Sequence, residues 1–234
     1  MLYTLSQIDK GLAAQVAYAL GLKIPESVDP PLNQSIPADG DPERYQSVNI
    51  DVKLSKSVPL SMAYTIKDTI RTRKVAILAA DGVDDASLNT VKTALETADA
   101  VVEIIAPRLG TIQSENDEAI TVHQSFLTAA SVFYDAVYIP GGINSVASIE
   151  AEPDAIHFLN EAFRHCKAIA ADKAALQVLE ATYFSKKLPK DGTESAESEG
   201  IVIDEHPVKI AQAFISAIAQ HRFWEREQPR KVPA

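Results

Sequence analysis

The chain has 234 residues, 46% of them hydrophobic and 23% charged, which indicates a folded globular protein and excludes collagen-like and low-complexity chains. Its formal net charge of −10 argues against a general nucleic-acid binder, and its single cysteine excludes an intramolecular disulfide and a cysteine-rich metal site. Because no run approaches the ~18 apolar residues of a membrane span and the N-terminus lacks the segments of a secretory signal, we expect a soluble, cytoplasmic protein.

The first element expected along the chain is a helix over residues 7–20, which Ser6 can cap and Gly21 can end. Its apolar side chains fall on one face: Leu12, Val16, Ala17 and Leu20. A single helix of this length is marginal in water unless another surface covers that face. We therefore expect residues 1–21 to be the terminal helix of a larger body that lies upstream.

A proline-rich segment follows this helix. Five of the 13 prolines lie in residues 25–42, where each one fixes φ and removes a backbone donor. Residues 22–72 are therefore expected to form a long extended linker, in which the alternating residues 48–54 (VNIDVKL) predict one edge strand. A linker of this length is uncommon inside one compact domain, so we expect it to join two bodies.

From residue 73 onward, strands and helices alternate. Apolar runs bounded by turn residues predict strands at residues 74–80, 101–106, 120–122, 136–139, 167–171 and 200–204. Amphipathic patterns predict helices at residues 86–98, 154–165, 174–182 and 208–226, and a short one beginning at Asn144 and Ser145. The polar segment 190–200 is expected to be a surface loop. This alternation predicts an α/β fold, a doubly wound parallel sheet with helices on both faces.

Three loops follow strands, at the edge where open parallel sheets bind their ligands: residues 81–85 (DGVDD), 140–144 (PGGIN) and 170–174 (AADKA). A strand that ends in Asp-Gly-X-acid-acid, a later YIPGG and a tight strand-to-helix turn ahead of Ala-Leu resemble the DJ-1/PfpI family. The resemblance covers about residues 73–185. It implies a flavodoxin-like fold of the class I glutamine amidotransferase-like superfamily for residues 73–234.

The same resemblance implies where a catalytic site would lie. Active members of that family carry a nucleophilic cysteine on the strand-to-helix turn, and Ala170 falls at that position here, with Asp172 at the glycine that follows. The family also supplies an acid from its first loop. Asp84 or Asp85 marks that region, although the usual acid position lies near Ser87. We therefore expect no catalytic residue, only a vestigial site.

Other residues at this edge leave several interpretations open. Asp172 can act as a nucleophile on a strained turn, or it can simply cap the helix that follows. Gly141 and Gly142 can hold a small anionic ligand together with a helix amino end. Cys166 precedes the strand 167–171 and is expected at the opposite edge, as a buried structural residue. The histidines show no metal-ligand spacing: His123, His157, His165, His206 and His221.

The whole arrangement carries a more specific resemblance. The helix LSQIDKGLAAQVAYALGL, the proline-rich linker and a DJ-1/PfpI-like domain without the nucleophile, ending in AFISAIAQHRFWERE, resemble the C-terminal region of large-subunit catalases. The resemblance implies a parent chain that decomposes hydrogen peroxide to water and oxygen with haem, in a homotetramer. The haem ligand of catalases is a tyrosine with an arginine four residues before it, and no tyrosine in this sequence has one.

The expectation is therefore a non-catalytic accessory domain that stabilises the catalase subunit and tetramer. Its partners would be the upstream core and neighbouring subunits, with no nucleic acid, no membrane, and neither cofactor nor metal in this segment. Two alternatives stay open. One is an independent DJ-1/PfpI-type hydrolase, glyoxalase or chaperone, and the other is a small-ligand binding module.

Overall fold

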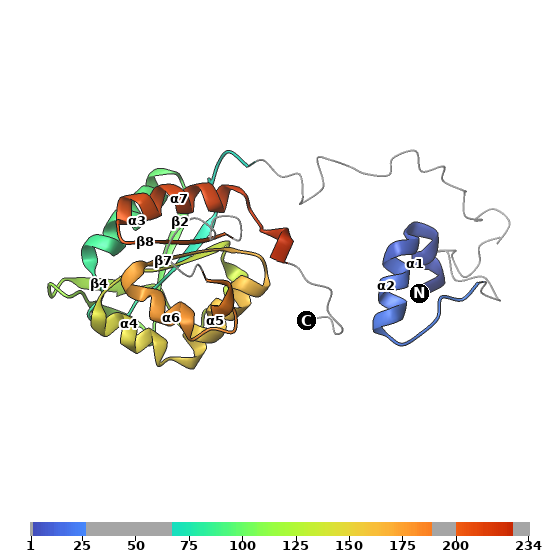
Figure 1. The fold of residues 1–234 in the computed structure, drawn as a ribbon, viewed down its shortest axis with the longest axis horizontal. Coiled ribbons are helices and arrows are strands. Elements are labelled where there is room, and N and C mark those ends of the chain that lie inside the picture. The colour runs from blue at the N-terminus through green and yellow to red at the C-terminus, as the bar shows by residue number, and fades with distance from the viewer. Residues whose placement is uncertain (1, 27–66, 189–199, 227–234) are drawn as a thin grey trace, which may run out of the picture. The chain divides into compact units, whose positions relative to one another are not determined.

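The computed structural model describes residues 2–26, 67–188 and 200–226 (Figure 1). Most of the expected linker, its edge strand at 48–54 and most of the expected surface loop at 190–200 lie outside the described residues. The chain divides into two compact units. The first contains Met1–Val58 with Pro229–Ala234, and the second contains Pro59–Gln228.

The first unit contains two short helices instead of the single helix expected over residues 7–20. These are α1 (Leu2–Ile8) and α2 (Lys10–Ala19), and the N-cap of α2 is Asp9, whose carboxylate accepts a backbone N–H from the first turn. The expected cap at Ser6 is wrong, because its hydroxyl donates to the Tyr3 carbonyl oxygen inside α1. Gly21 does end α2, at a φ of +65° that favours glycine.

Within its own unit, α2 leaves most of its apolar side chains uncovered. Ala13 and Ala17 are buried. Leu2, Tyr3, Leu5 and Val16 are half-buried, and five other larger apolar residues of α1, α2 and the following turn are exposed: Ile8, Leu12, Tyr18, Leu20 and Leu22. Of the apolar face predicted from the sequence, Ala17 is buried and Val16 is half-buried, whereas Leu12 and Leu20 are exposed, so the face is only partly covered. No helix among the described residues is long and apolar enough to cross a membrane.

The second unit is built on a six-stranded sheet, in which all neighbouring strands are parallel and their order is β5-β2-β1-β6-β7-β8. Its strands are β1 (Lys74–Leu78), β2 (Val101–Ala106), β5 (Gln124–Ser125), β6 (Ala136–Ile139), β7 (Ala168–Asp172) and β8 (Ile201–Asp204). A separate antiparallel hairpin consists of β3 (Gly110–Gln113) and β4 (Ala119–Val122). Without the short β5, the strand order follows the flavodoxin-like pattern, so the predicted fold is confirmed.

Helices cover both faces of this sheet (Figure 1). They are α3 (Asp85–Thr97), α4 (Ile143–Glu150), α5 (Pro153–Arg164), α6 (Leu176–Glu180) and α7 (Pro207–Ala219). Successive residues of each strand point to opposite faces, so the core has two layers. One layer joins α3 and α7 to residues such as Val75 and Tyr138, and the other joins α4, α5 and α6 to residues such as Ala76 and Val137.

Two of the expected helices have different ends in the structure. The helix expected over 174–182 is divided into a 3-10 turn at Lys173–Ala175 and α6. The helix expected over 208–226 ends at Ala219, because His221 adopts a left-handed φ of +69° and the chain turns back. Phe223 then packs against Gly200, and its N–H donates to the carbonyl oxygen of Cys166.

Candidate functional site

The three loops singled out in the sequence do meet at the carboxyl ends of β1, β6 and β7. The Asp84 N–H donates to the Gly141 carbonyl oxygen at 3.0 Å, which joins the first loop to the second. Gly141 also lies against Asp172, since a Cβ at Gly141 would be 3.3 Å from the carboxylate carbon. This contact joins the second loop to the third.

Three buried polar side chains connect these loops from within. The Ser87 hydroxyl donates to the Asp172 carboxylate at 2.9 Å and lies 2.6 Å from the Tyr138 hydroxyl. Because the one Ser87 proton points to the carboxylate, Tyr138 is the donor to Ser87. The other Asp172 oxygen accepts the Ala174 N–H at 2.9 Å. Each of these polar groups is therefore paired, and we call Ser87, Tyr138 and Asp172 the polar triad.

The electrostatics of the triad agree with this direction of donation. Burial raises the pKa of Tyr138, the negative charges of Asp172 and Asp84 raise it further, and the hydrogen bond to Ser87 opposes them. The phenol therefore stays protonated at physiological pH and remains a donor. Sequence reasoning missed Tyr138, whose only signal is a phenol inside an otherwise aliphatic strand, AVYI.

The nucleophile position is a regular part of the sheet. Ala170 is fully buried within β7 and is paired with Tyr138 and Val202 on the neighbouring strands. Asp172 ends β7 with φ −63° and ψ 145°, so the strained turn considered for it is not present. Its carboxylate caps the following 3-10 turn, which confirms the capping interpretation. Neither residue offers a nucleophile held in a strained, exposed conformation.

Asp84 and Asp85, two of the three acidic residues of the first loop, have structural partners. Asp84 is the N-cap of α3, and its carboxylate accepts the Ser87 N–H at 3.0 Å. Asp85 accepts from the Asn116 side-chain amide at 2.8 Å. Asp84, Asp85 and Glu115 place one carboxylate oxygen each within 4.8 Å of one another. The Asp84 and Asp85 carboxylates thus hold the loop in place.

The Gly141–Gly142 turn is packed tightly against the first loop. Gly142 has a φ of +108°, and a Cβ there would lie 2.6 Å from the Asp84 nitrogen and closer still to the Gly82 carbonyl oxygen. The Ser145 hydroxyl accepts the Ala80 N–H at 2.9 Å beside it. The space next to the turn is therefore filled by protein atoms, and ligand binding by these glycines stays a prediction.

Cys166 lies before β7, at the amino end of the strand, as the sequence predicts. It is 3% exposed and has a φ of +58° in the connection from α5. A strand rises ~3.3 Å per residue, so Cys166 is roughly 20 Å from Asp172 at the other end of β7. It is therefore remote from the polar triad.

Cys166 is expected to resist alkylation. A buried thiol away from a helix amino terminus reacts only after local opening, so iodoacetamide should modify Cys166 about 100-fold more slowly than glutathione at the same pH. Mass spectrometry of a labelling time course measures the rate. A rate equal to that of glutathione would contradict the assignment of Cys166 as a structural residue.

Asp172 is expected to matter for stability. Asp172→Ala leaves the Ser87 hydroxyl and the Ala174 N–H without their acceptor, which should lower the free energy of unfolding by about 2–4 kcal/mol. Urea denaturation followed by circular dichroism measures the loss. Asp172→Asn keeps an acceptor oxygen and should lose less than half as much. Equal losses in the two variants would show that the hydrogen bonds are not responsible.

Two buried tyrosines of the domain use their hydroxyl groups in internal hydrogen bonds. Tyr134 and Tyr138 are buried, but the hydroxyl of Tyr134 donates to Glu103 at 2.6 Å and that of Tyr138 donates to Ser87. Two surface hollows, of about 250 and 380 Å³, are lined by no tyrosine. The hydroxyl groups of Tyr134 and Tyr138 are therefore engaged within the domain.

Comparison with known proteins relates the chain to catalases. A family model described as the C-terminal domain found in long catalases matches residues 71–228. Catalase HPII of Mycobacterium avium is 35% identical over 236 aligned positions, which cover 98% of this chain and 30% of that protein. Catalase-2 of Bacillus subtilis is 34% identical, over 94% of this chain and 28% of that protein. The chain thus spans about 30% of the length of these relatives.

Solved structures of the DJ-1 superfamily have the same fold. Oxidised DJ-1 of Toxoplasma gondii matches with a TM-score of 0.54 and 18% identity, over 66% of this chain and 94% of that one. A DJ-1 superfamily protein of Salmonella typhimurium matches with a TM-score of 0.52 and 21% identity, over 64% and 90%. At such low sequence identities, these matches show a shared fold and nothing about function. The family, however, follows from the match over residues 71–228 and from the identity along nearly the whole chain: this protein belongs to the C-terminal domains of long catalases.

Proposed function

We propose that residues 73–234 form a non-catalytic accessory domain that stabilises the subunit and tetramer of a cytoplasmic catalase. The parent polypeptide would decompose hydrogen peroxide to water and oxygen with haem, which its upstream core would hold. The observation that carries the proposal is the buried polar triad, which fills the edge of the sheet where this fold binds ligands.

The triad supports a structural role in a specific way. Serine, tyrosine and aspartate could together perform acid–base chemistry if they faced a cavity, but Ser87 and Tyr138 are fully buried and Asp172 is 7% exposed. Each hydroxyl proton is already directed to an acceptor within the triad. This geometry supports a domain that holds its loops together, and it argues against a hydrolase, a glyoxalase or a ligand-binding module.

We further propose that residues 1–21 are the end of the upstream catalase core and that residues 22–72 link it to the domain. The uncovered apolar side chains of α1 and α2 support this assignment, because burying an aliphatic side chain contributes about 1.5–3 kcal/mol. A pair of short helices with such a face is expected to pack on a larger body.

The experiment that tests the proposal compares the complete catalase polypeptide with a version that lacks residues 73–234. Both should turn over peroxide at a similar rate per haem at 25 °C, because the domain supplies no catalytic group. The truncated enzyme should lose its activity several-fold faster at elevated temperature and dissociate from the tetramer more readily. Equal inactivation rates would contradict the stabilising role, and loss of turnover at 25 °C would contradict the non-catalytic one.

A further inference from the structure

The connection between β5 and β6 exposes large apolar side chains. Leu127 is 84% exposed, Val132 is 73% exposed and Phe133 is 62% exposed. All three belong to residues 127–133, which we call the apolar loop. Single exposed apolar residues are normal on a protein surface, but three within seven residues mark a candidate contact surface.

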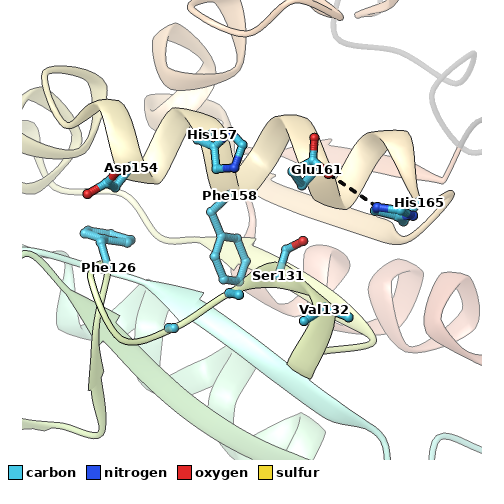
Figure 2. Close-up of a pocket in the computed structure, with 10 residues that line it drawn as sticks. Phe126, Ser131, Val132, Asp154, His157, Phe158, Glu161 and His165 are labelled. Atoms are coloured by element: carbon cyan, nitrogen blue, oxygen red, sulfur yellow. Dashed lines mark ion pairs between the residues drawn. The ribbon is translucent and has the colours of Figure 1, made fainter. Parts of the chain in front are cut away.

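A groove separates the apolar loop from helix α5 (Figure 2). It has a volume of about 250 Å³. Phe126 and Phe158 contribute aromatic rings to it, and Val132 stands at its rim. The lining along α5 extends from Asp154 to His165, which at ~1.5 Å per residue is roughly 16 Å. That length accommodates about five residues of an extended chain at ~3.3 Å each.

Hydrogen bonds at both ends of the 3-10 turn fix the part of the apolar loop that lines the groove. The buried Lys167 ammonium donates to the Ser131 carbonyl oxygen, and the Tyr134 hydroxyl donates to Glu103 at 2.6 Å. Residues Ser131–Phe133 form a 3-10 turn between these two anchors. The exposed apolar side chains therefore stand on a preformed surface, so binding would cost little ordering of the loop.

The lysine, arginine, aspartate and glutamate positions of the groove lining are all acidic. Its carboxylates are Asp154 and Glu161, its other titratable groups are His157 and His165, and no lysine or arginine lines it. One Glu161 carboxylate oxygen lies 3.4 Å from an Arg164 guanidinium nitrogen, and the other lies 3.3 Å from the His165 Nε2. Asp154 is exposed in the first turn of α5. A complementary occupant would carry apolar side chains and at least one lysine or arginine.

We propose that this groove and the apolar loop bind a basic, apolar segment of the catalase polypeptide that lies outside residues 1–234. The inference rests on the proposed function and adds the surface by which the domain would act. The relatives support the choice of occupant, because this chain spans only about 30% of their length and the remaining polypeptide would be tethered to the domain. Tethering raises the effective concentration of such a segment, so even a modest groove can stay filled.

Photo-crosslinking in the complete polypeptide identifies the occupant. Phe133 is replaced by p-benzoylphenylalanine, and Leu109, which is 58% exposed in another loop, is replaced in a matched control. The expected product joins position 133 to a peptide outside residues 1–234 that contains lysine or arginine, with little product from position 109. A crosslink between two copies of the apolar loop, a crosslink to an acidic peptide, or no product would each overturn the proposal.

Substitutions then test the chemistry of the groove. Val132→Asp adds a charge to the apolar rim, and Asp154→Lys reverses the charge on α5. With the crosslinker at position 133, each should reduce the yield about tenfold, because each places an unfavourable charge against a basic, apolar occupant. Val208→Asp, at a site 59% exposed on α7, should leave the yield unchanged. Retention of full yield in both groove variants would refute the docking site.

The outcome can be separated from that of the proposed function. If deletion of residues 73–234 accelerates inactivation but Val132→Asp does not, the domain stabilises the enzyme through another surface and only the groove proposal fails. If the crosslink forms as expected but deletion leaves inactivation unchanged, the groove is a real contact and the stabilising function fails. Val132 is largely exposed, so its substitution should not alter the melting temperature of the isolated 234-residue chain.

Discussion

Gly142→Ala is expected to destabilise the domain strongly. The residue has a φ of +108°, and its new Cβ would lie 2.6 Å from the Asp84 nitrogen. A strained backbone costs about 1–3 kcal/mol and overpacking costs a similar amount, so the free energy of unfolding should fall by about 2–6 kcal/mol. Urea denaturation of the 234-residue chain measures this loss, provided that the variant folds.

Gly110→Ala is the matched control for that experiment. Gly110 has nearly the same φ, +109°, but no atom lies within 4 Å of the position that a Cβ would occupy. Its loss should therefore contain only the backbone strain, about 1–3 kcal/mol. If the two variants lose equal stability, then the close packing of Gly142 against the first loop contributes nothing measurable. If Gly142→Ala fails to fold while Gly110→Ala folds, the packing argument stands.

Lys167 is expected to make stability depend on pH in the alkaline range. Burial, together with the charge of Arg222, lowers the pKa of this lysine from 10.5 to about 8. Between those two pH values the unfolded chain binds more protons than the folded one, so this group makes stability rise with pH. Below pH 8 both states are protonated and the penalty is constant. The whole effect amounts to about 3 kcal/mol at most.

Lys167→Met isolates that dependence. The stability of the unsubstituted chain minus that of the variant should increase from pH 8 to pH 9.5, because the variant lacks the titrating ammonium. Using the difference cancels tyrosines and other groups that titrate in both proteins. A constant difference for Lys167→Met would show that the buried ammonium is not penalised.

The central strands could be predicted from the sequence because their signals are local. The expected strands at 101–106 and 136–139 coincide with β2 and β6 residue for residue. The residues of β3 and β5 show no hydrophobic pattern that predicts a strand. β3 has one buried residue in four and β5 is only two residues long, so pairing with neighbouring segments determines them. Periodicity over so few residues cannot distinguish a strand from a loop.

The helix ends that were predicted wrongly depend on tertiary contacts or on a choice between similar caps. The amphipathic pattern of α7 continues past Ala219, but the chain turns back there and Phe223 packs against Gly200 instead of extending the helix. Asp9 competes successfully with Ser6 as a cap, and both residue types are good N-caps. Local preference therefore located these helices, whereas contacts distant in sequence or nearly equal caps decided where they begin and end.

The candidate site was predictable in position but not in detail. The rule that ligands bind at the carboxyl ends of parallel strands correctly brought the three loops together. The polar triad was not predictable, because Ser87 lies 51 residues from Tyr138 and 85 residues from Asp172 in sequence. Each side chain taken alone fits an ordinary role, and only the folded geometry shows that they satisfy one another.

The two outer strands of the sheet affect how readily the domain aggregates. An outer strand presents unpaired backbone groups that can recruit a strand from another molecule. β5 offers only two residues for such recruitment, and β8 offers four and ends at Asp204, which Glu205 and Pro207 follow closely. Short strands, negative charge and proline all oppose strand addition. Crowded copies of this domain should therefore resist forming intermolecular sheets, even when they are held at high local concentration.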